Sequence, residues 1–142
     1  MTPADIALAR RAVACNGWRW VRGMLRQDDY RYIGSGVWVR WLDVHSFITA
    51  LHAPGQLPDF TDPATLGCLL ALVREAWRCP NVYVRQSTTR RKSDGVIAWE
   101  VCDLYLDAEA CRALGVPRGG SVGFWGHGSE AEALVATLEA KP

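Results

Sequence analysis

The amino-acid sequence predicts an α+β fold, in which an antiparallel or mixed sheet carries three to four helices packed mainly on one face. Two observations predict it. Runs of β-branched and aromatic residues come in neighbouring groups, and segments with helical spacing of apolar residues separate those groups. The chain has 142 residues, of which 49% are hydrophobic and 22% charged, a composition typical of a globular protein. We therefore expect residues 1–142 to form a single α+β domain.

The first predicted element is a helix. Thr2 is a suitable N-cap, and Pro3 suits the first helical position. The apolar residues of its expected buried face are Ile6, Ala9 and Val13. Asn16 and Gly17 are expected to end the helix, because both residue types tolerate a left-handed backbone.

Residues 18–45 are expected to form two or three antiparallel strands, since they are rich in Trp, Tyr, Val and Ile. Polar or glycine-rich breaks at 27–29 and 34–36 separate these strands. The next segment, residues 47–52, fits no single pattern and is compatible with a short helical turn. Residues 53–55, Ala-Pro-Gly, close it.

The strongest helical signal covers residues 63–78. Asp62 is the expected N-cap and Pro63 the first helical residue. One face carries Leu66, Leu69, Leu70, Val73 and Trp77. We expect this helix to be the most buried one, and Pro80 prevents its continuation.

The last third of the chain is expected to hold three strands and two helices. Strands at 82–87 and 96–106 flank a turn at 93–95, and a third strand covers 121–125. A short helix is expected at 108–114. Ser129 and Glu132 form a capping box for a final helix. Its buried face is expected to be Ala131, Leu134, Val135 and Leu138.

The cysteines and histidines predict no catalytic residue, no metal site and no cofactor. The odd number of cysteines and their wide spacing indicate reduced thiols. The five are Cys15, Cys68, Cys79, Cys102 and Cys111. Close ligand pairs and an HExxH pattern are both missing from the sequence. Cys15 is expected near a helix C-terminus, where the helix dipole would raise the pKa of a thiol and weaken it as a nucleophile.

The charge distribution and the lengths of the apolar segments indicate where in the cell the protein is found. The net charge is +1, but residues 1–57 carry +3 and residues 58–142 carry −2. The N-terminus lacks the pattern of a secretory signal. No stretch approaches the roughly 20 apolar residues of a membrane helix. We therefore expect a cytoplasmic protein that makes no membrane contact.

Tryptophan and arginine alternate in the basic half of the chain, and a basic run marks the predicted hairpin tip. Such residues anchor protein interfaces, and they also stack nucleobases and hold phosphates. The alternative is that the tryptophans face the core and the arginines face water. The candidate partner-binding or nucleic-acid-binding residues are Trp18, Arg19, Trp20, Arg22, Arg40, Trp41, Arg90, Arg91 and Lys92, with Arg26 as a further cation.

A glycine-rich stretch precedes the final helix. Free backbone N–H groups at a helix N-terminus can bind an anion. The candidate anion-binding residues are Gly126, His127, Gly128 and Ser129. The alternative is a tight turn followed by a capped helix, because neither the dinucleotide fingerprint nor a P-loop is present.

Three stretches, residues 14–25, 57–77 and 128–135, resemble small uncharacterised proteins of tailed bacteriophages and prophages. The resemblance implies a phage or prophage origin and a bacterial host cytoplasm. It transfers no functional residue. It favours an accessory protein that binds a host or phage macromolecule.

Taken together, the sequence favours a non-catalytic binding protein that contacts a protein partner or associates with itself. The surplus of tryptophan, the uneven charge and the lack of a catalytic constellation lead to this hypothesis. Two alternatives stay open: a nucleic-acid-binding protein with an Arg/Trp surface, and an enzyme with a cleft near His127.

Overall fold

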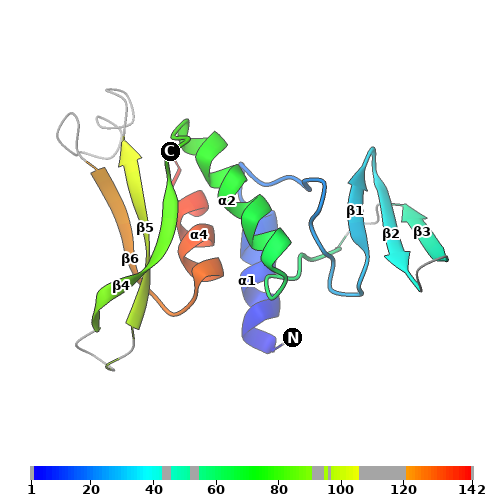
Figure 1. The fold of residues 1–142 in the computed structure, drawn as a ribbon, viewed down its shortest axis with the longest axis horizontal. Coiled ribbons are helices and arrows are strands. Elements are labelled where there is room, and N and C mark those ends of the chain that lie inside the picture. The colour runs from blue at the N-terminus through cyan, green and yellow to red at the C-terminus, as the bar shows by residue number, and fades with distance from the viewer. Residues whose placement is uncertain are drawn as a thin grey trace. The chain divides into compact units, whose positions relative to one another are not determined.

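A computed structural model of the chain describes residues 2–42, 46–51, 55–90, 95, 97–105 and 121–141 (Figure 1). These residues form helices and antiparallel sheets, which confirms the α+β class. The helices are α1 (Pro3–Ala14), α2 (Pro63–Trp77) and α4 (Glu130–Glu139). The strands are β1 (Arg31–Gly34), β2 (Val37–Trp41), β3 (Phe47–Leu51), β4 (Tyr83–Arg90), β5 (Ile97–Tyr105) and β6 (Ser121–His127).

The strands form two separate three-stranded sheets, where the sequence had predicted one. Their orders are β1-β2-β3 and β4-β5-β6. The chain divides accordingly into two compact units. Unit 1 comprises Met1–Ala14 and Trp18–Cys68, and unit 2 comprises Cys15–Gly17 and Leu69–Pro142. The expected short helix at 108–114 lies outside the described residues.

In unit 1, α1 begins with a reciprocal cap. The Asp5 carboxylate accepts a hydrogen bond from the Thr2 N–H (2.7 Å), and the Thr2 hydroxyl accepts one from the Asp5 N–H (3.2 Å). This confirms the predicted start of the helix. The buried face differs slightly from the expected one, because Ala9 and Ala12 are fully buried while Val13 is partly exposed.

The sheet of unit 1 is a meander of short strands. The turn between β1 and β2 has positive φ angles at Gly34, Ser35 and Gly36, which explains the two glycines there. Residues 47–51 form strand β3, so the helical turn considered for this segment is wrong. Every residue of β3 is paired with a residue of β2, from Phe47 opposite Trp41 to Leu51 opposite Val37. This non-local pairing decides the conformation of an ambiguous segment.

Trp18 and Trp20 do not lie on a strand. The segment from 18 to 24 has no regular secondary structure, and its first backbone pairing with β1 is the hydrogen bond from the Gly23 N–H to the Tyr32 carbonyl (2.8 Å). The prediction of strands throughout residues 18–45 is therefore wrong at its start. This segment is held by contacts between aromatic rings, described below, and not by the hydrogen bonds of a sheet.

Unit 2 packs α4 against the sheet β4-β5-β6 (Figure 1). The predicted face of α4 is confirmed, since Ala131, Leu134, Val135 and Leu138 are all buried. From α2, Leu69, Val73 and Trp77 are buried as expected, together with Leu72. The indole N–H of Trp77 donates to the backbone carbonyl of Thr137 at 3.0 Å, which links α2 to α4.

The sequence predicts the end of α1 correctly, but the structure gives a different reason for the glycine there. Neither Asn16 nor Gly17 has a positive φ. Gly17 is instead a point of close packing within unit 2. A Cβ atom there would lie 2.9 Å from Leu138 Cδ1 and 3.6 Å from Ala76 Cβ.

Candidate functional site

Aromatic side chains from distant parts of unit 1 pack edge to face. The ring centroids of Trp20 and Trp38 lie 4.5 Å apart, and those of Trp18 and Trp20 lie 5.6 Å apart. Tyr32 adds a tilted contact with Trp38 at 5.0 Å. Trp38 is fully buried, while Trp18 and Trp20 are half-buried. The cluster is therefore both part of the core and part of the surface.

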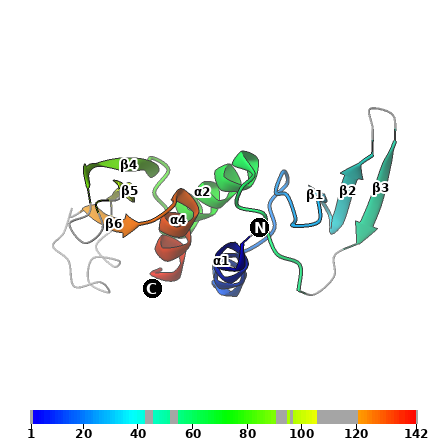
Figure 2. The same cartoon turned by 90° about the horizontal axis from the view of Figure 1, so that it is seen from below.

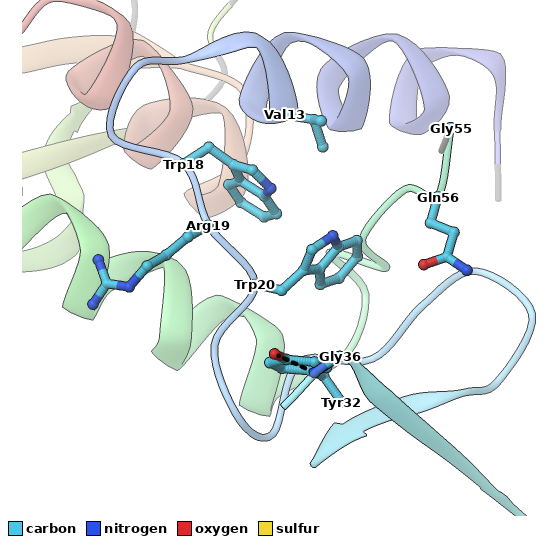
Figure 3. A pocket seen from close by; sticks show the side chains of 8 residues that line it. All are labelled: Val13, Trp18, Arg19, Trp20, Tyr32, Gly36, Gly55 and Gln56. Carbon is cyan, nitrogen blue, oxygen red and sulfur yellow. Dashed lines mark hydrogen bonds between the residues drawn. The ribbon is translucent and has the colours of Figure 1, made fainter. Parts of the chain in front are cut away.

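The half-buried side of this cluster faces an open hollow of about 560 Å³, which we call the aromatic hollow (Figure 3). In Figure 3 the indoles of Trp18 and Trp20 lie below Val13 of α1, and Gln56 lies to the right of Trp20. The lining residues are Val13, Trp18, Arg19, Trp20, Tyr32, Gly36, Gly55 and Gln56. A concave surface with aromatic walls and few polar groups is the usual form of a ligand or side-chain pocket.

The Tyr32 hydroxyl and the Trp18 indole N–H differ in their hydrogen bonding. The hydroxyl of Tyr32 accepts a hydrogen bond from the Gly36 N–H at 3.1 Å, which fixes the orientation of the ring. The indole N–H of Trp18 is buried and has no hydrogen-bond partner among the described residues. A buried donor without a partner costs stability, which sets the Trp18 indole apart from the Tyr32 hydroxyl.

Arg26 is a structural residue. It is buried, and its guanidinium lies over the ring of Tyr30 at 4.5 Å and over that of Trp38 at 5.2 Å. It also forms a bidentate ion pair with Asp28, and this hydrogen bonding holds the pKa of that carboxyl below its ordinary value. Its charge is thus used within unit 1, which makes it a poor candidate for binding phosphate.

Several of the predicted cations lie on the surface of unit 1. Arg19 and Arg22 are exposed, and Arg19 also lines the aromatic hollow. Arg40 is exposed on β2 and lies 3.8 Å from the carboxylate of Asp29. For the other predicted residues, Trp41 is in β2 and Arg90 in β4, whereas Arg91 and Lys92 lie outside the described residues.

The candidate anion site at the start of α4 is occupied by the protein's own carboxylate. The Gly128 N–H donates to Glu132 Oε2 at 2.7 Å, and the Glu132 N–H donates to the Ser129 hydroxyl at 3.1 Å. The predicted N-cap at Ser129 is thus confirmed, and the Glu132 carboxylate closes back on Gly128, one residue before the expected partner. Gly126 and His127 end strand β6. An external anion would have to displace Glu132, so we do not propose a site around His127.

Among the described thiols, Cys68 is the one whose surroundings the structure defines in most detail. Cys68 and Cys102 are half-buried free thiols. Burial raises the pKa of the Cys68 thiol, and the nearby charge of Asp62 raises it further. The Cys68 Sγ donates to the Arg22 carbonyl at 3.7 Å. A thiol held in its protonated form is a weak nucleophile and a weak metal ligand.

Sequence reasoning missed a second surface of unit 1. Phe47, Ile48 and Leu51 on β3 are 54%, 40% and 78% exposed. We call the side of this strand that faces away from β2 the β3 edge. Residues 47–51 look like a core segment in sequence, because their composition does not reveal that β2 is the one strand paired with them among the described residues.

Comparisons with protein-family models, with curated proteins and with solved structures found no match to this chain. No helix among the described residues combines the length and apolar character that crossing a membrane requires.

Proposed function

We propose that this chain is a non-catalytic binding protein, and that the aromatic hollow of unit 1 receives an apolar or aromatic side chain of a protein partner. The observation that carries the proposal is the hollow itself, with two half-buried tryptophans and a fixed tyrosine in its wall. On the resemblance to phage and prophage proteins, we propose that this partner is found in a bacterial host cytoplasm.

The chemistry of the lining supports a protein partner. Trp, Tyr and Arg are the residue types that contribute most to protein interfaces, especially in concave positions that exclude water. Here Trp20 packs on the buried Trp38, and Tyr32 is held by Gly36. Because these rings are already ordered, binding would cost little side-chain entropy.

Site-specific photo-crosslinking tests the proposal. A photo-reactive phenylalanine analogue replaces Gln56, which lines the hollow, and in a control protein it replaces Ala71, which is exposed on α2. We expect a defined crosslinked protein from position 56 and none from position 71. The crosslink should disappear with Trp20→Ala and persist with Trp20→Phe. Identical crosslinking at both positions would sink the proposal.

A nucleic-acid-binding function is a second candidate. The observation in its favour is that the exposed Arg19 lies in the same hollow as Trp18 and Trp20. Stacking on indoles together with phosphate contacts is how many proteins bind single strands. Affinity for a labelled oligonucleotide should then fall steeply with salt, and Arg19→Gln should reduce the slope. A flat salt response excludes this candidate.

A further inference from the structure

Residues 47–51 of the β3 edge lack the charged side chains, the proline and the bulge that often protect an exposed sheet edge. Natural edge strands carry charged residues, proline or a bulge, which discourage pairing with another chain. Residues 47–51 contain no charge and no proline, and their pairing with β2 is continuous in register. The sheet order leaves β3 outermost, with no further strand beside it among the described residues (Figure 2).

The strand is also complementary to itself. In an antiparallel pair centred on Thr49, Phe47 of one copy faces Leu51 of the other, and Ile48 faces Ala50. Each of these pairs is apolar, and the central pair joins two threonines. Apolar and threonine–threonine pairs stabilise antiparallel neighbours, and no like charges oppose each other. A two-fold axis through the centre makes both copies contribute the same surface.

We propose that β3 pairs antiparallel with β3 of a second copy of this chain, with the two Thr49 residues facing each other across the two-fold axis. The β1-β2-β3 sheet of one copy and the β1-β2-β3 sheet of the other would then form one six-stranded sheet. This pairing uses a different surface from the aromatic hollow and does not depend on the proposed function.

The exposed apolar area of β3 determines how strongly we expect two copies to associate. The exposed apolar area is limited to three side chains, Phe47, Ile48 and Leu51, and pairing along a strand edge covers only part of each. The pair would bury less than the roughly 1,200 Å² of standard stable interfaces. Main-chain hydrogen bonds between the strands add directionality. We therefore expect weak, reversible association that increases with protein concentration.

A charge swap at the two-fold axis tests the register. Thr49 is exposed, so Thr49→Lys and Thr49→Glu leave the core intact. In the proposed pair each variant places two like charges directly opposite each other. Sedimentation velocity over a hundredfold range of concentration should show that the wild type self-associates and that each variant alone is monomeric. An equimolar mixture of the two variants should associate again.

Other outcomes overturn the proposal. A wild type that stays monomeric throughout the range shows that a second copy does not cover β3. Variants that still associate alone show that a different surface pairs. A mixture that fails to associate, although both variants melt like the wild type, shows that Thr49 does not lie on the axis.

Discussion

The carboxylate of Asp62 accepts hydrogen bonds from both the backbone N–H and the hydroxyl of Thr65, each at 2.8 Å. The Thr65 hydroxyl in turn accepts the Leu25 N–H at 2.8 Å, and Arg31 donates to Asp62 at 3.1 Å. One helix cap thus also holds the irregular segment before β1 and the first residue of β1. This arrangement ties Leu25 and Arg31, on either side of the turn that precedes β1, to the start of α2.

We expect Asp62→Ala to reduce the stability of unit 1 at pH 7 by about 1–2 kcal/mol, the usual cost of losing an N-cap. Partial burial opposes ionisation of Asp62, but hydrogen bonds from Arg31 and Thr65 outweigh it and lower its pKa. A carboxyl whose pKa is lower in the folded state stabilises the fold above its unfolded pKa, near 3.9. This contribution is lost as the pH falls through the lowered folded value.

The difference between wild type and Asp62→Ala should therefore shrink from pH 7 to pH 3 in urea unfolding curves. Asp29→Asn is the matched control, because Asp29 is exposed and its carboxylate lies 3.8 Å from the guanidinium of Arg40. Exposed pairs of this kind contribute little. A gap between wild type and Asp62→Ala that is the same at both pH values would contradict the assigned role of the carboxylate.

Local signals in the sequence predicted the helices well. The cap at Asp62, the N-cap at Ser129 and the apolar face of α4 all depend on residues three or four positions apart. Such signals do not require knowledge of distant contacts. The same is true of the β1–β2 turn, where glycine permits the positive φ angles.

Features that depend on distant residues could not be predicted. Phe47 and Ile48 form a strand because β2 lies beside them, and the division into two sheets decides which edge stays free. The aromatic hollow joins Val13, Trp20 and Gln56 from three separate segments. The alternation of tryptophan and arginine correctly drew attention to residues 18–20. It could not show that Trp38 is buried and Arg26 is paired.

Two tryptophans should respond differently to replacement by phenylalanine. Trp77→Phe removes the hydrogen bond to the Thr137 carbonyl and should cost about 1–3 kcal/mol. Trp18→Phe removes an indole N–H that has no partner among the described residues, so the gain from losing a buried donor should offset part of the lost packing. Guanidinium unfolding followed by far-UV circular dichroism measures both. A Trp18→Phe variant as destabilised as Trp77→Phe would show that the Trp18 N–H is satisfied in solution.

Gly17→Ala should destabilise unit 2, because the added methyl group would lie 2.9 Å from Leu138 Cδ1 in a buried contact. Gly67→Ala provides the control, since Gly67 is exposed in α2 and a Cβ there meets nothing within 4 Å. Alanine at position 67 should instead stabilise the helix by about 0.5–1 kcal/mol.

The clash also predicts that the effects of Gly17→Ala and Leu138→Ala on the free energy of unfolding are not additive. In a Leu138→Ala background the Cδ1 atom is gone, so the further change Gly17→Ala should cost much less than it does in the wild type. The coupling energy comes from thermal or chemical unfolding of the wild type, both single variants and the double variant. Equal costs in the two backgrounds would mean that the contact with Leu138 does not account for the effect of Gly17→Ala.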